Sequence, residues 1–312
     1  MKLLINTMQI NKIHNIDFLN NTLPNKCAQL IIADPPYFEV KGSFDFIWES
    51  FDDYLKDVAI ECKRILSDNG TLFWWGDKKR IAYTQIILDK YFNLENSLIW
   101  RKPDSMQYQY YSPDLAKTFN THNERLLMYS ANSDNNNTFA KYLDYKIKFY
   151  SIKMKDIQLL YPSKTGGLTG CVSNWINGEN IMTEYQYDQL QIKFGKHIFD
   201  RDYKDLINEY ELNRRYFYNE TKLEEVLNFS QESSITKDYD HPTKKAETIT
   251  RALIMTCSRE NDLVVVPFAG SGTECAMSAK ENRNFIGFDI EYKFVEMSNK
   301  RCIEHLRTQS LF

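Results

Sequence analysis

The sequence predicts an α/β fold: one doubly wound, mostly parallel sheet whose two halves are separated by an inserted region. Two observations predict it. At both ends of the chain, apolar runs that suit buried strands alternate with segments of helical hydrophobic spacing. Between residues 131 and 237 this alternation stops, and afterwards it resumes. We therefore expect one domain in two parts, residues 1–130 and 238–312, interrupted by a separate region at 131–237.

The N-terminal part contains a clear amphipathic helix. Apolar residues recur at helical spacing from Phe51 to Leu66, with acidic residues in the first turn and basic residues in the last, which suits the helix dipole. Asn69-Gly70 is expected to end this helix. The other predicted elements of this part are a strand at 71–75, a helix at 80–91, and strands at 97–100 and 125–129.

The C-terminal part repeats the alternation of helices and strands. Polar runs at 130–137 and 230–234 bound the inserted region that precedes it. The predicted elements are a helix at 245–257, a buried strand at 263–266, a helix at 273–281, a strand at 284–289 and a last helix that reaches Leu306.

Composition limits the classes of protein. The chain has 312 residues, 43% of them hydrophobic, which is ample material for a core. Its net charge of -3 is not that of a typical nucleic-acid binder, although a local basic face would suffice for one. No apolar stretch approaches the roughly 20 residues that span a bilayer, and the N-terminus becomes polar too early for a secretory signal. We expect a soluble intracellular protein with no membrane partner.

The six cysteines favour a structural role. They form no Cys-x-x-Cys pair, and the five histidines do not complete a metal-ligand spacing. Several of them fall inside apolar patterns, so we expect buried free thiols and no metal site.

A glycine turn after the strand at 263–266 suits a nucleotide-like cofactor. Gly270 and Gly272 permit a tight turn whose backbone amides can approach a ligand closely. Asp289 ends the next strand, where a carboxylate can hold a ribose diol. Cys275 replaces the third glycine of the dinucleotide pattern, and the P-loop lysine is absent, so a nucleoside is favoured. The alternative is an ordinary strand–helix turn with a solvated Asp289.

The segment Asp34-Pro35-Pro36-Tyr37 follows the buried strand Leu30–Ala33. The two prolines are rigid and donate no hydrogen bond. Asp34 and the Pro35 carbonyl could therefore both accept from one amino group on a flat base, which favours a pyramidal nitrogen with a usable lone pair. Tyr37 could stack on the base face. In isolation, this segment could equally be a plain turn.

Together, the two segments make the chain resemble the amino-methyltransferases of DNA, specifically their circularly permuted β group. In that group the catalytic motif comes first, the target-recognition region second and the cofactor motif last. The resemblance covers the tetrapeptide 34–37, the helix end 61–66 with Gly70, the segments 122–127 and 241–245, and the loop 268–273.

This resemblance implies a Rossmann-like fold, S-adenosylmethionine as cofactor and double-stranded DNA as partner, with 1–130 as the catalytic part, 131–237 as the target-recognition region and 238–312 as the cofactor-binding part. A homodimer and a cognate restriction enzyme would be further partners. The residues themselves do not predict either of them. The implied catalytic residues are Asp34, Pro35, Pro36 and Tyr37. The implied cofactor-binding residues are Asp34, His241, Thr243, Lys245, Phe268, Ala269, Gly270, Ser271, Gly272, Thr273 and Asp289.

The chain departs from the family pattern at two positions. The family usually has Asp-Pro-Phe before the glycines, where this chain has Val266-Pro267-Phe268. It also often has proline at the position of Ala246. Both departures bear on cofactor affinity.

The inserted region starts with a basic, aromatic stretch. Six lysines stand against two aspartates between Thr138 and Gly170, interleaved with tyrosines and phenylalanine. Such mixtures suit phosphate and base contacts, although a solvated face over core aromatics is the alternative. The candidate DNA contacts are Lys146, Lys148, Lys153, Lys155 and Lys164.

The function that the resemblance implies is transfer of a methyl group to N6 of an adenine flipped out of duplex DNA. Asp at position 34 favours adenine, since cytosine-N4 enzymes more often have Ser there. The alternatives are a cytosine-N4 methyltransferase, a methyltransferase of RNA or of a protein amide, and a non-catalytic DNA-binding module whose cofactor affinity is weakened by Val266.

Overall fold

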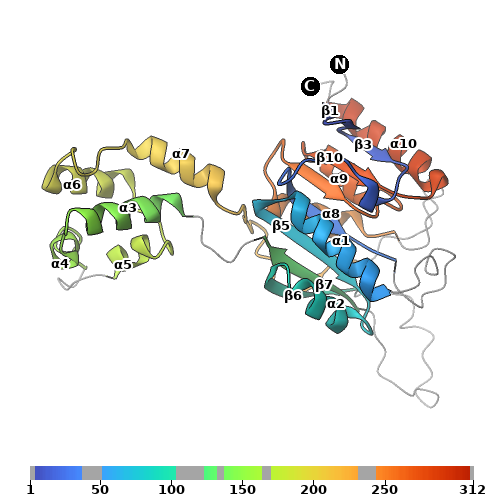
Figure 1. The fold of residues 1–312 in the computed structure, drawn as a ribbon, viewed down its shortest axis with the longest axis horizontal. Helices are drawn as coiled ribbons and strands as arrows, with labels where there is room; N and C mark the ends of the chain where they lie inside the picture. Colours follow the sequence, from blue (N-terminus) through green and yellow to red (C-terminus); the bar gives the residue numbers. More distant parts are fainter. Residues whose placement is uncertain are drawn as a thin grey trace, which may run out of the picture. The chain divides into compact units, whose positions relative to one another are not determined.

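The computed structural model describes residues 4–36, 51–102, 123–131, 137–163, 170–230 and 244–309. The chain forms two compact units, one made of residues 1–133 and 215–312 and the other of residues 134–214 (Figure 1). The second unit is thus inserted in the first. It ends earlier than the predicted boundary at 237, because Val226–Asn228 forms strand β8 of the first unit's sheet.

The first unit is built on an eight-stranded sheet in the order β3-β10-β9-β4-β5-β7-β6-β8. Its strands run parallel except where β7 pairs with β5 and β6. Their bounds are Lys12–His14 (β3), Ala28–Ala33 (β4), Leu66–Gly76 (β5), Asn93–Arg101 (β6), Asn123–Ser130 (β7), Val226–Asn228 (β8), Leu263–Val266 (β9) and Asn284–Phe288 (β10). A short hairpin of β1 (Leu4–Ile5) and β2 (Met8–Gln9) precedes it.

Helices cover both faces of this sheet, as the predicted doubly wound fold requires. On one face, α8 (Glu247–Cys257), α9 (Thr273–Lys280) and α10 (Tyr292–Gln309) pack on alternate strand residues such as Leu30 and Val264. On the other face, α1 (Phe51–Ile65), α2 (Ile81–Leu88) and the 3-10 helix η1 (Phe18–Asn20) pack on residues such as Ile31 and Val265 (Figure 1). The period-2 alternation of strand side chains fills both cores.

One predicted boundary is wrong. Asn69-Gly70 does not end the first helix, because α1 already ends at Ile65 and β5 begins at Leu66. Leu66 pairs with Ala28, and the register then shifts before Leu30 pairs with Thr71. Gly70 lies in this irregular stretch, where a Cβ would come within 2.5 Å of Leu66 Cδ1. The glycine therefore accommodates a kinked strand start, which local sequence does not distinguish from a helix end.

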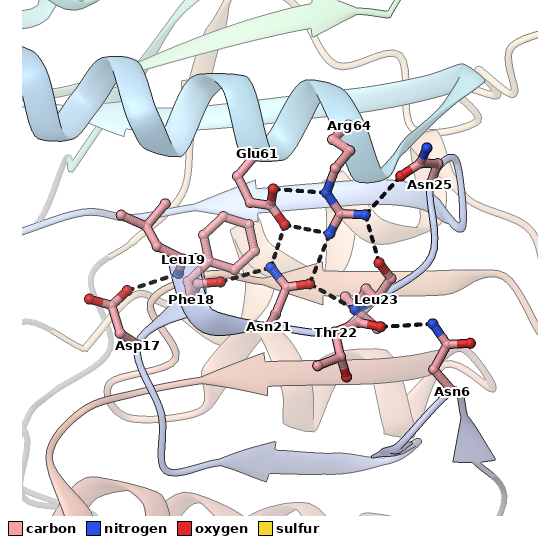
Figure 2. Close-up of polar contacts among 10 residues, drawn as sticks. All are labelled: Asn6, Asp17, Phe18, Leu19, Asn21, Thr22, Leu23, Asn25, Glu61 and Arg64. Atoms are coloured by element: carbon pink, nitrogen blue, oxygen red, sulfur yellow. Dashed lines mark hydrogen bonds and ion pairs between the residues drawn. The ribbon is translucent and has the colours of Figure 1, made fainter.

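A polar network fastens the segment before β4 to α1 (Figure 2). Arg64 Nη1 donates to the Leu23 carbonyl at 2.7 Å, and Arg64 Nε donates to Glu61 at 2.9 Å. Asn21 Nδ2 donates to the same Glu61 carboxylate at 2.5 Å and to the Phe18 carbonyl at 2.7 Å. These bonds hold the segment that leads into β4, whose other end leads to Asp34.

The second unit is helical in its described residues, with α3 (Thr138–Phe149), α4 (Met154–Gln158), α5 (Cys171–Ile176), α6 (Glu184–Phe194) and α7 (Tyr203–Asn213). It has its own core, which includes Phe139, Leu143, Trp175 and Tyr187. The core aromatics cluster, with Phe139 edge-on to Tyr187 at 6.0 Å. The sequence offered no element prediction for this region.

All six cysteines are free, and Cys62, Cys257, Cys275 and Cys302 are buried, as expected for small apolar side chains. Within the part of the chain that is described, no helix has the length and apolar character to cross a membrane.

Candidate active site

The sheet brings the two sequence motifs together. β4 and β9 are neighbours and run parallel, with Leu30 opposite Val264 and Ile31 opposite Val265. Asp34 directly follows β4, and Pro267 directly follows β9. Ligands of open α/β sheets bind at the carboxyl ends of the strands. The motifs from opposite ends of the chain therefore open onto one site.

A chain of alternating charges crosses this site. Lys245 Nζ lies 2.9 Å from Asp34 Oδ1 and 2.9 Å from Glu124 Oε2, and Glu124 also pairs with Lys102. Burial alone would raise the pKa of Glu124, but the charges of Lys245 and Lys102 outweigh it and lower that pKa to about 2. Glu124 is therefore ionised at neutral pH, and Lys245 links it to Asp34.

Two tryptophans lie beneath the two lysines. Lys245 Nζ lies 5.0 Å from the ring centroid of Trp75, and Lys102 Nζ lies 4.3 Å from that of Trp100. The rings pack edge to face with centroids 5.8 Å apart, and Trp100 Nε1 donates to the Phe229 carbonyl at 2.8 Å. Both rings are buried, so cation–π contacts support the lysines in a desolvated position.

Hydrogen bonds from helix α10 hold the loop that follows β9. Gly270 and Gly272 have φ values of 45° and 70°, in the left-handed region that favours glycine. Arg301 on α10 donates to the Ser271 carbonyl at 3.0 Å and to Thr273 Oγ1 at 2.9 Å, and it also pairs with Glu247. Ser298 Oγ donates to the Gly270 carbonyl at 2.7 Å. Helix α10 thus holds the turn that opens α9.

Asp289 lies at the same edge, directly after β10. One of its oxygens accepts from the Gly270 amide at 2.8 Å, and the other accepts from the Glu291 amide at 2.8 Å. Burial raises the pKa of Asp289. Each carboxylate oxygen has a second lone pair, so this oriented group can still accept hydrogen bonds from a ligand's hydroxyls.

The other predicted site residues have different environments. Phe268 is half-buried and lies edge-on to Tyr54 at 6.1 Å, which leaves part of its ring for a ligand. Ala269, Ser271 and Thr273 are buried, and they build the loop. Pro35 is buried and Pro36 half-buried. Tyr37, His241, Thr243 and Lys164 lie outside the described residues.

Sequence reasoning missed several residues of this site. Glu124, Lys102, Trp75, Trp100 and Arg301 were not among its candidates. Glu124 falls within the segment 122–127 that carried part of the resemblance, and that was the available signal. The others have no local signature, since they reach the site from different strands and from α10.

The two departures from the family pattern lie inside the core. Val266 is 1% exposed and packs with the apolar residues of the α8–α10 face. Ala246 is also buried there, at the N-cap position of α8. Both side chains are thus part of the apolar packing.

Two of the candidate DNA contacts pair with carboxylates, although one of these two, Lys148, is still largely exposed. Lys146 lies 2.8 Å from Asp200, and Lys148 lies 2.7 Å from Asp144. Lys153 and Lys155 are exposed at the start of α4. The Lys146 ammonium is thus already paired with a carboxylate of its own unit.

A glycine loop between a parallel strand and a helix, with an acid after the next strand, is the arrangement of Rossmann-like α/β folds. A family model described as DNA methylase (N6_N4_Mtase) matches residues 28–300. The chain therefore belongs to this family and is a DNA methyltransferase, as its motifs predicted.

Known DNA methyltransferases are similar to this chain over most of their length. The chain is 24% identical to the DNA adenine methyltransferase YhdJ of Escherichia coli over 286 residues, covering 89% of this chain and 77% of that protein. It is 26% identical to the type II methyltransferase M1.MboII of Moraxella bovis, covering 94% and 96%. Among solved structures, the cytosine-N4-specific PvuII DNA methyltransferase matches with a TM-score of 0.55 and 11% identity, covering 95% and 93%. This last likeness concerns the fold alone.

Proposed function

We propose that this protein transfers the methyl group of S-adenosylmethionine to N6 of an adenine in duplex DNA. The observation that carries the proposal is the carboxylate of Asp34, held by Lys245 beside the loop that follows β9. The ion pair keeps Asp34 available as a hydrogen-bond acceptor. A base amine placed there would donate one proton to Asp34 and the other to the Pro35 carbonyl.

The residues of the loop fit the cofactor. Asp289 offers oriented carboxylate oxygens for a ribose diol, Phe268 offers part of a ring face for a flat base, and the glycines keep the turn tight. When bound, S-adenosylmethionine supplies an electrophilic methyl group on a sulfonium. The protein's contribution is then orientation and electrostatic matching, in which Asp34 and Pro35 grip the amine and the buried tryptophans exclude water.

Adenine is the favoured base for two reasons. Asp at position 34, rather than Ser, favours the N6 reaction, and YhdJ is named as an adenine methyltransferase. Cytosine N4 is the second candidate, since the PvuII enzyme shares the fold. Both reactions need the same amine grip, so only the product separates them.

The second unit, residues 134–214, is proposed as the target-recognition region. On α3, Tyr145 and Phe149 stack with centroids 5.6 Å apart, and Tyr150 meets Phe149 edge-on at 5.0 Å. All three rings are exposed, beside the exposed Lys148. Exposed aromatics mixed with cations suit contact with unpaired bases and phosphates.

We propose that the protein acts in the prokaryotic cytoplasm or nucleoid, where the substrate DNA is located. A homodimer is tested by sedimentation of the purified chain. A cognate restriction enzyme is tested by survival of cells when the gene is deleted. Relatives described as type II and as orphan methyltransferases both match the chain, so neither arrangement is favoured.

The function is tested by incubating the protein with labelled S-adenosylmethionine and duplex DNA, single-stranded DNA, RNA or protein, followed by mass spectrometry of the nucleosides. N6-methyladenine from duplex DNA alone is expected. Asp34→Ala should reduce transfer at least about 100-fold, while Asp68→Ala, at an exposed ion pair with Lys26, should not. N4-methylcytosine, or an active Asp34→Ala protein, would reject the proposal.

A further inference from the structure

Glu274 is a buried carboxylate that the proposed function does not yet use. It is the second residue of α9, directly after the turn of Gly270 and Gly272, and it is only 4% exposed. Acidic residues in a first helical turn are common, but they are usually solvated. Its Oε1 atom has no hydrogen-bond partner among the described residues. A buried, unsatisfied carboxylate is costly unless something else binds it.

The charges around Glu274 come from three other elements. Asp34 contributes a negative charge from the end of β4, and Lys245 and Arg301 contribute positive charges from the start of α8 and from α10. Burial first, and then Asp34, raise the pKa of Glu274 to about 7, against the opposing effects of its own amide, Lys245 and Arg301. Next to it, burial raises the pKa of the Cys275 thiol, and the charges of Cys302 and Glu274 add to this effect.

The two neighbouring cations already serve other groups. Lys245 is shared between Asp34 and Glu124 at 2.9 Å each. Arg301 binds Glu247, the Ser271 carbonyl and Thr273 Oγ1. When Glu274 is ionised beside Asp34, the site therefore has room for one more positive charge. A ligand that carries a cation would provide it.

The sequence pattern adds an independent reason. The resemblance places a carboxylate at position 266, close to the cofactor, but Val266 is apolar and packed in the core. Glu274 lies just beyond the same loop, so it can restore a negative charge to the cofactor half of the site.

We propose that Glu274 binds the positively charged methionine end of S-adenosylmethionine, and that it gives up a proton to solvent when it does so. The inference rests on the proposed use of this cofactor. Below pH 7, Glu274 is mostly neutral before binding, which avoids two adjacent buried negative charges, and it is ionised afterwards, opposite the ligand's cation. No other bond forms or breaks.

The test is titration calorimetry of the full-length protein with S-adenosylmethionine at pH 6.5, in two buffers of different ionisation enthalpy. The buffer dependence should report release of a large part of one proton per site, and affinity should rise roughly tenfold between pH 5.5 and 7. Glu274→Gln should abolish the proton release, flatten the pH dependence and weaken binding at least about 10-fold.

Glu281→Gln is the matched control. Glu281 directly follows α9 and pairs with the exposed Arg251, so this variant should behave as wild type. If Glu274→Gln does not fold, Glu274→Asp keeps the charge and should keep proton release, and the wild-type buffer series remains decisive without any variant.

S-adenosylhomocysteine identifies the cation, because it has the ammonium but lacks the sulfonium. Proton release with this product assigns Glu274 to the ammonium, and its loss assigns Glu274 to the sulfonium. Both results support the proposal. Tight cofactor binding with no proton release, equal in wild type and Glu274→Gln, would overturn the inference and leave the function intact. No binding by the wild type at all would overturn both.

Discussion

The ammonium of Lys245 lies 2.9 Å from the carboxylate of Asp34, although the two residues come from opposite ends of the chain. The parallel pairing of β4 with β9 and the position of α8 bring them together. Lys245 is 4% exposed and also neutralises Glu124. One buried lysine therefore joins the amine-binding half of the site to the strand that carries Glu124.

Replacing Lys245 should destabilise the protein. Lys245→Met leaves Asp34 and Glu124 without their shared cation, and removing one partner of a buried ion pair costs about 3 kcal/mol or more. The free energy of unfolding from urea titration at pH 7 measures this loss. Lys300→Met removes a largely exposed pair with Glu296 and should change it by less than about 0.5 kcal/mol. Equal effects of the two variants would contradict a buried role for Lys245.

Stability should fall in acid through Glu124. Its pKa is about 2 in the folded protein, below the ordinary 4.5, so its contribution is present above pH 4.5 and is lost as pH falls toward 2. The shift corresponds to about 3 kcal/mol as an order of magnitude. Urea midpoints measured from pH 5 to pH 2.5 should fall more steeply for wild type than for Glu124→Gln. Glu260→Gln, at an exposed position, should follow the wild type.

The loop before α9 should not tolerate a side chain at Gly272. This residue has φ of 70°, and a Cβ would lie 2.6 Å from Ser298 Cβ. Gly272→Ala should lower the free energy of unfolding by about 1 kcal/mol or more and weaken cofactor binding. Gly170→Ala is the control, because its φ is -75° and no atom lies within 4 Å of the position that a Cβ would take. Unchanged calorimetric affinity in Gly272→Ala would show that the turn does not shape the site.

The exposed aromatic rings of α3 should contribute to DNA binding. Phe149 is 65% exposed and stacks on Tyr145. If the second unit contacts DNA, Phe149→Ala should weaken binding of a methylatable duplex about 10-fold, since stacking on a base contributes about 1–3 kcal/mol. Tyr185→Ala, on α6 and equally exposed, is the control. Fluorescence anisotropy at fixed salt measures both, and equal affinities would remove this surface from the proposal.

Much of the first unit could be predicted from local pattern. The strand at 263–266 was placed at its observed bounds, and the neighbouring helices were placed within a few residues, because strand and helix spacing are properties of short windows. The start of β5 was misplaced for the complementary reason. The irregular start of β5 around Gly70 depends on its pairing with β4, and the residues of β4 are too far away in the sequence for a local pattern to include them.

Residue types in fixed local order were enough to predict the fold class and the family and to locate the two candidate motifs around Asp34 and Gly270. Only the tertiary structure determined which charged side chains lie next to one another. Lys245 could pair with Asp34 and Glu124 only after three separate segments were aligned, and Glu274 resembled an ordinary acidic residue in a first helical turn until packing buried it. Electrostatic partners are chosen by distance in space, and distance in space is what a sequence window does not contain.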